Sequence, residues 1–156
     1  MKKWISLLLT VLILLSCSGC QRNQKADFYY TRGEIQYGIA DGVISGETRN
    51  LPGDDKDLEF LLKLYLEGPV SKELVNPFPK GTSLLSLVQT DKTIFLTFSD
   101  AFAQQESLEY IISCACIAST CFSLTDAYTV TIVSNETSIT MTRENLILSD
   151  LTKLQD

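Results

Sequence analysis

Apolar residues spaced three and four positions apart predict two helices. The first covers residues 56–67, and its expected buried face consists of Leu58, Leu61, Leu62, Tyr65 and Leu66. The second covers residues 106–122, and its expected buried stripe consists of Leu108, Ile111, Ile112, Ala115, Ala118 and Phe122. We therefore expect both helices to pack on a hydrophobic core through these faces.

Residues that favour strands precede, separate and follow the two helices. Early strands are expected within 28–30 and 35–39, an extended segment over 43–51, a hairpin from 82–88 and 93–98, and later strands within 127–133 and 139–142. The order β, α, β, β, α, β predicts an α+β fold. We expect a single compact domain with a small, mostly antiparallel sheet and both helices packed on one face.

Glycines and prolines divide the segment between the first helix and the hairpin. Gly68-Pro69 should end the helix, because glycine accepts a positive φ and proline cannot continue the helix. Further along, Leu74, Val75 and Phe78 are apolar, which predicts a loop over residues 68–81 that is held on the domain.

Three carboxylates, Asp54, Asp55 and Asp57, precede the first helix. A calcium loop would need alternating oxygen ligands, an internal glycine and a distal glutamate, whereas this segment continues directly into an apolar helix. We therefore expect the turn over 52–55 to supply a carboxylate N-cap, and we predict no metal site and no cofactor.

The N-terminus has the pattern of an export signal. Met1-Lys2-Lys3 is followed by an apolar run over 4–16, shorter than the ~20 residues that a spanning helix needs. Ser16 precedes Cys17 in the arrangement that a lipoprotein signal peptidase requires, and Cys20, after Ser18-Gly19, is the alternative lipidation site.

These features divide the chain into four parts. We expect a lipoprotein signal peptide over 1–16, a lipidated cysteine and flexible polar tether over 17–27, the α+β domain over 28–148 and a C-terminal tail over 149–156. Two acyl chains on the cysteine would hold the protein stably on a membrane.

The charge of the chain argues against nucleic acid as a ligand. Removal of the signal peptide takes away two of the 13 basic residues, Lys2 and Lys3, and none of the 19 acidic ones, so the net charge falls from −6 to −8. Phosphate recognition needs a basic surface with aromatic residues among the basic ones, and the sequence has no such stretch. Membrane attachment is therefore expected through the lipid alone.

The residue types needed for common catalytic sites are scarce. The sequence contains no histidine, which excludes Ser-His and Cys-His nucleophile pairs, and no carboxylate pair is singled out by position, so we predict no catalytic residue. Cys114 and Cys121 lie about 10.5 Å apart along a helix, beyond the ~7 Å limit for a disulfide. With Cys116, they are expected to be small buried core residues, and a reactive or metal-binding role is the alternative.

The spacing of these signals resembles a known family. The segments Leu66-Glu67-Gly68-Pro69, Asn76-Pro77-Phe78-Pro79-Lys80-Gly81-Thr82 and Leu96-Thr97-Phe98-Ser99, together with Leu62, Leu74-Val75, Leu84-Leu85-Ser86 and Asp91, resemble the GerMN domain of sporulation and spore germination. The match extends from about Ile35 to Val133. It covers one such domain, where the founding sporulation protein has two in tandem.

The resemblance implies a compact α+β domain, similar to ring-building modules, that binds other proteins in the bacterial envelope and has no catalytic residues to carry over. We therefore expect a non-enzymatic lipoprotein on the extracytoplasmic face of a Gram-positive cell membrane. Its expected partners are other envelope or sporulation proteins, and self-association into an oligomer is left open.

The expected partner surface is the loop and an exposed sheet edge, since an edge with unpaired backbone groups accepts another strand. The candidate loop residues are Gly68, Pro69, Pro77, Phe78, Pro79 and Gly81. The alternative function is an extracytoplasmic ligand- or cell-wall-binding lipoprotein, or a weak hydrolase. A pocket with converging polar groups would favour that alternative, and a flat surface with an open edge would favour assembly.

Overall fold

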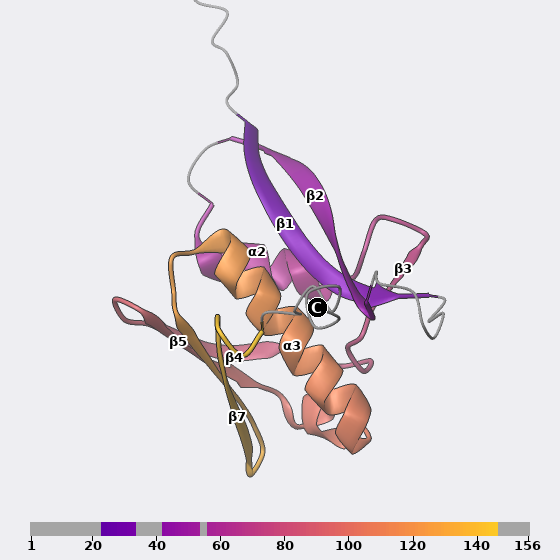
Figure 1. The fold of residues 1–156 in the computed structure, drawn as a ribbon, viewed down its shortest axis with the longest axis vertical. Coiled ribbons are helices and arrows are strands. Elements are labelled where there is room, and N and C mark those ends of the chain that lie inside the picture. Colours follow the sequence, from indigo (N-terminus) through magenta and orange to yellow (C-terminus); the bar gives the residue numbers. More distant parts are fainter. Residues whose placement is uncertain (1–22, 34–41, 54–55, 147–156) are drawn as a thin grey trace, which may run out of the picture.

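A computed structural model describes residues 23–33, 42–53 and 56–146 and places seven strands in two sheets (Figure 1). The strand order is β2-β1-β3 in the first sheet and β4-β5-β6-β7 in the second. The α+β class predicted from the sequence is confirmed. The single sheet expected there is replaced by two, because β1 pairs only with β2 and β3 and has no backbone pairing to the second sheet.

The four-stranded sheet contains β4 (Leu84–Gln89), β5 (Thr93–Phe98), β6 (Thr129–Ser134) and β7 (Thr137–Thr142). The predicted hairpin is confirmed, with Leu87 opposite Leu96. β5 and β6 are parallel and are connected by the 3₁₀ helix η1 (Asp100–Gln104) and helix α3 (Ser107–Leu124). Alternate residues of β5 and β6 point into the core, namely Ile94, Leu96, Phe98, Val130 and Ile132.

The three-stranded sheet is built on the long strand β1 (Asn23–Arg32), which pairs along β2 (Ile44–Pro52) and, at its end, with the two-residue strand β3 (Leu74–Val75). Alternate residues of β1, namely Ala26, Phe28 and Tyr30, are buried. The strand therefore starts inside the segment 17–27 that was expected to be a tether, because its first residues already pair with β2. The strand expected within 35–39 lies outside the described residues.

Helix α2 (Leu58–Leu66) follows the sequence prediction closely, since Leu61, Leu62 and Tyr65 are buried. Its N-cap differs from the prediction. Asp57 takes this position and accepts a hydrogen bond from the N–H of Phe60 at 2.7 Å, whereas the cap was expected from the turn over 52–55. A cap is effective only immediately before the first helical turn, and Asp57 is the carboxylate at that place.

Helix α3 does not bury the stripe that its sequence predicted. Leu108 and Ile111 are 69% and 49% exposed, and of the six predicted residues only Ala118 and Phe122 are buried. The buried side instead carries Tyr110, Ser113, Cys114, Cys116, Ile117, Thr120 and Cys121. By length and composition α3 could cross a membrane, but 56% of it is buried inside the domain, as expected of a core helix.

The position of strand β1 explains why α3 turns a different face to the core from the one that the sequence predicted. The backbone N–H of Tyr29 donates to Thr120 Oγ1 at 2.9 Å, and Ser123 Oγ donates to the carbonyl of Asp27 at 2.7 Å. A strand can come this close only to a helix face of small side chains that also offer hydrogen-bonding groups. Of the larger aliphatic residues of α3, Ile117 is buried, whereas Leu108 and Ile111 remain on the outer side. The two helices lie between the β1–β2 ribbon and the four-stranded sheet (Figure 1).

Candidate interaction surface

The loop that follows α2 is anchored by an ion pair from strand β2. Arg49 Nη2 donates to the carbonyl of Gly68 at 2.6 Å and to the hydroxyl of Tyr30 at 2.9 Å, and Arg49 Nε donates to Glu47 Oε1 at 2.6 Å. The guanidinium also lies 4.8 Å from the centre of the Phe28 ring. Both charged side chains are only 11% exposed, so this pair joins the three-stranded sheet to the C-terminal end of α2.

Glu47 completes the anchor by accepting hydrogen bonds from the N–H groups of Val70, at 3.1 Å, and Ser71, at 2.8 Å. Burial raises the pKa of Glu47, but these backbone hydrogen bonds and Arg49 outweigh burial, and the pKa lies below its ordinary value. Because Arg49 and Glu47 lie about twenty residues before the loop in a segment expected only to be extended, sequence reasoning did not find them.

Two glycines of the loop have positive φ values, +101° at Gly68 and +92° at Gly81. A Cβ on Gly68 would also lie 3.0 Å from Asn76 Nδ2, so this position needs glycine for both its conformation and its space. Gly68 is buried, and its role in the domain is therefore structural.

Phe78 connects the loop to the core on both sides. Its ring centre lies 5.0 Å from that of Tyr65 on α2 and 6.4 Å from that of Phe102 on η1. Phe102 in turn contacts Phe98 of the four-stranded sheet and Tyr110 of α3, with ring centres 5.0 Å and 5.1 Å away. This chain of aromatic contacts keeps the loop in place and makes Phe78 mainly a core residue.

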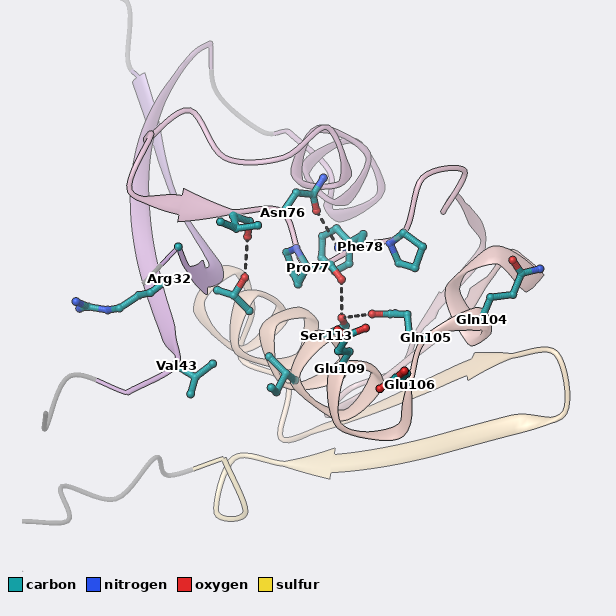
Figure 2. A pocket seen from close by; sticks show the side chains of 15 residues that line it. Arg32, Val43, Asn76, Pro77, Phe78, Gln104, Gln105, Glu106, Glu109 and Ser113 are labelled. Atoms are coloured by element: carbon teal, nitrogen blue, oxygen red, sulfur yellow. Dashed lines mark hydrogen bonds between the residues drawn. The ribbon is translucent and has the colours of Figure 1, made fainter. Parts of the chain in front are cut away.

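A pocket of about 580 Å³ lies between this loop, the end of β1 and the first turns of α3 (Figure 2). Its apolar walls include Val43, Val75, Pro77 and Ile112. The Ser113 hydroxyl donates to the carbonyl of Pro77 at 2.8 Å and also lies 2.8 Å from Gln105 Oε1. These polar groups are hydrogen-bonded to one another and hold the loop on α3. The apolar walls are therefore the main surface that the pocket offers to a ligand.

The exposed stripe of α3 continues this pocket along the helix. Ile112 lines the pocket, and Leu108 and Ala115 lie one turn before and after it on the same side of the helix. Ile111 lies one turn from Leu108 and from Ala115, farther around the helix from the pocket. Leu108 and Ile111 are exposed, while Ile112 and Ala115 are half-buried. We call Leu108, Ile111, Ile112 and Ala115 the α3 stripe. Together with the pocket, it forms a contiguous apolar surface of the kind that often marks a contact with another molecule.

The predicted loop residues divide between this surface and the interior. Pro77, Phe78 and Pro79 line the pocket, whereas Gly68, Pro69 and Gly81 are not part of it. The lipidation candidates Cys17 and Cys20 lie outside the described residues. Sequence reasoning assigned the α3 stripe to the core, because helical spacing of apolar residues does not reveal which side of a helix the rest of the chain covers.

The three cysteines of α3 are free thiols in the core. Cys114, Cys116 and Cys121 are buried, and burial raises the pKa of each thiol to about 12. The sequence expectation of small buried core residues is confirmed. Within the described ranges, no group of three or more histidine, cysteine or acidic side chains is placed to hold a metal ion.

The C-terminal end of α3 is closed by an arginine that follows β7. Arg143 donates to the carbonyls of Phe122, at 2.6 Å, Thr125, at 2.7 Å, and Ala127, at 2.6 Å. Its guanidinium also lies 5.0 Å from the ring centre of Phe122. Arg49 has the corresponding position at the end of α2, where it donates to the carbonyl of Gly68. The C-terminal end of each helix is therefore bound by an arginine, Arg49 from strand β2 and Arg143 from the residue after β7.

Comparison with known proteins places the chain in a family. The family model Germane, described as sporulation and spore germination, matches residues 28–139. The chain belongs to this family. A search of curated proteins found no match. The family relation supports a role related to sporulation or germination.

Two solved structures resemble the chain. The tandem GerMN domains of the sporulation protein GerM from Bacillus subtilis match with a TM-score of 0.55 and 16% sequence identity, over 76% of this chain. The chain spans 41% of the length of that tandem structure, and the likeness shows a shared fold. A putative lipoprotein from Clostridium perfringens matches with a TM-score of 0.45 and 18% identity, over 79% of this chain and 89% of that one.

Proposed function

We propose that this protein is a non-enzymatic lipoprotein of the cell envelope whose domain holds other proteins in sporulation, germination or envelope assemblies. In this proposal Cys17, or alternatively Cys20, carries the lipid and keeps the domain on the extracytoplasmic face of the membrane. The α3 stripe and the adjacent pocket form the contact surface.

The observation that carries the proposal is the exposure of the α3 stripe. A monomer gains stability by burying leucine and isoleucine, and Leu108 and Ile111 remain exposed on an otherwise well-packed helix. Contact surfaces between proteins have an apolar centre and a polar rim, and the stripe and its surroundings have this composition. The family relation to sporulation and germination agrees with a role in assembly.

Site-specific photo-crosslinking in cells tests the contact surface. A photoreactive amino acid at Ile111 should crosslink the full-length protein to an envelope protein, in sporulating cells, in vegetative cells or in both. The same amino acid at Phe95, which is 45% exposed on the outer face of the four-stranded sheet, is the matched control and should give none of these products. Crosslinks from Phe95 alone would refute the α3 surface.

Membrane attachment has its own test. Metabolic labelling with a fatty acid should mark the wild-type protein, and Cys17→Ser should abolish the label and release the protein from the membrane fraction. If Cys20→Ser has this effect and Cys17→Ser does not, the alternative cysteine carries the lipid. Label retained in the double variant would contradict lipidation at this position.

The pocket favours a second candidate function, the binding of an extracytoplasmic ligand or of cell wall. Its volume of about 580 Å³ is within the range of small-molecule sites. Such sites usually present several polar groups to the ligand, but Ser113, Gln105 and Asn76 already bond to the loop and to neighbouring residues. Cosedimentation with purified peptidoglycan, lost in Ile112→Ser, would support this second candidate.

A further inference from the structure

The charges beside the α3 stripe limit what can bind there. Glu106, the N-cap residue of α3, and Glu109, in its first turn, line the pocket and are exposed. Neither has an ion-pair partner among the residues that the structure describes. Arg32 also lines the pocket, but Figure 2 shows its guanidinium directed away from α3. The pocket is therefore bordered by negative charge at the N-terminal end of α3, where Glu109 lies one turn from Ile112 of the α3 stripe.

The polar groups inside the pocket do not offset this negative charge. Asn76 Oδ1 accepts from the N–H of Phe78 at 3.1 Å, and Gln105 Nε2 donates to the carbonyl of Phe102 at 3.0 Å. With Ser113 bonded to Pro77, these groups maintain the loop and do not form a site for an anion. The recognition chemistry that remains is an apolar surface next to two carboxylates.

We infer that the α3 stripe and the pocket bind a segment of a partner protein that combines leucine-like apolar side chains with lysine or arginine. This inference rests on the proposed function and names the chemistry of the partner. The apolar side chains fill the pocket and cover Ile111, while the basic side chains pair with Glu106 and Glu109. Pairing at such a rim contributes mainly to specificity and to the rate of association.

Charge also decides between this occupant and two others. The net charge of the whole chain is −6, and the carboxylates stand at the edge of the surface, so an anionic phospholipid layer would be repelled there. A second copy of this chain that binds through the same surface meets the same difficulty, since the same two glutamates line its own pocket. A segment of another protein that is both basic and apolar can cover the apolar residues and pair with the two carboxylates.

The test uses the full-length protein in nanodiscs of zwitterionic lipid, with empty nanodiscs as background. The probe is a fluorescent peptide made only of leucine and lysine at amphipathic helical spacing, and fluorescence anisotropy measures its binding. Peptides in which glutamate replaces lysine, or serine replaces leucine, are the matched controls. We expect the leucine–lysine peptide to bind and both control peptides to bind far more weakly.

Variants of the protein locate the site. Ile111→Ser should weaken binding of the leucine–lysine peptide roughly tenfold, as expected for an apolar residue at the centre of a contact. Glu106→Gln with Glu109→Gln should weaken it roughly fivefold and remove most of its dependence on salt. Phe95→Ser on the sheet should leave the affinity unchanged. All of these residues are exposed, and thermal unfolding checks that each variant is folded.

Several outcomes would overturn the inference. Equal binding of the leucine–glutamate peptide, or unchanged affinity in the double glutamine variant, would remove the role of charge. Binding of the protein to phosphatidylglycerol vesicles through Ile111 would assign the surface to lipid, and self-association abolished by Ile111→Ser would assign it to a second copy. If Ile111 crosslinks to envelope proteins in cells while peptide charge has no effect, the proposed function stands and this inference fails.

Discussion

Helices α2 and α3 are both apolar, yet they contribute to the protein in different ways. α2 buries Leu61, Leu62 and Tyr65, and it leaves Phe60, which is 46% exposed, on the outside with charged residues such as Lys63 and Glu59. α3 buries three cysteines, Ala118, Ser113 and Thr120 along with the larger Tyr110, Ile117 and Phe122, and it leaves Leu108 and Ile111 outside.

The difference follows from what each helix packs against. α2 meets β1 through the Tyr65 side chain, whose hydroxyl donates to the carbonyl of Tyr29, so a large residue bridges the space. α3 bonds directly to the β1 backbone through Thr120 and Ser123, which requires small side chains. The side of α3 that β1 approaches therefore carries the small residues Thr120 and Ser123, while Leu108 and Ile111 lie elsewhere on the helix surface and are exposed.

The largest expected effect is on stability, and it comes from replacing one leucine of each helix by alanine. Leu62→Ala should lower the free energy of unfolding by about 2–5 kcal/mol, because a buried leucine leaves a cavity. Leu108→Ala, on the exposed side of α3, should change it by no more than about 0.5 kcal/mol. Chemical denaturation of both variants measures the difference. Equal losses would show that the α3 stripe is buried in solution.

A smaller effect is expected at the anchor that follows α2. Glu47→Gln should cost about 1–3 kcal/mol, because it removes the charge that pairs with the half-buried Arg49 and that accepts hydrogen bonds from two backbone N–H groups. Glu59→Gln, in the exposed pair with Lys63, is the matched control and should cost less than about 0.5 kcal/mol.

The same anchor makes stability depend on pH. The folded-state pKa of Glu47 is depressed, so its contribution is fully present above the ordinary value of 4.5 and is lost as the pH falls through the folded-state pKa. The stability difference between wild type and Glu47→Gln should thus be constant near neutral pH and shrink below pH 4.5. A difference that grows on acidification would contradict this account.

The smallest expected effect is the rate at which a thiol reagent modifies the cysteines on the buried side of α3. The thiols of Cys114, Cys116 and Cys121 are buried and have pKa values of about 12, so they should remain neutral and react only when the domain opens. Mass spectrometry after a thiol reagent should therefore show modification of these residues in denaturant and almost none in the native protein. Rapid labelling of native Cys116 would place that side of α3 at the surface.

Several features of this protein follow from local sequence alone. The α+β class, the hairpin of β4 and β5, the end of α2 at Gly68-Pro69 and the buried face of α2 were all predictable, because each depends on neighbouring residues or on a single period. The family resemblance has the same source, since its glycines and prolines set turns within one continuous segment.

Other features were decided only by the tertiary structure. Sequence spacing located the apolar stripe of α3, but the position of β1 determined that Leu108 and Ile111 face outward. Likewise, the extended segment that contains Glu47 and Arg49 gave no sign that these residues would hold the loop after α2. The physical reason is the same in both cases: local periodicity determines which residues share a face, and contacts between distant segments determine which face is buried.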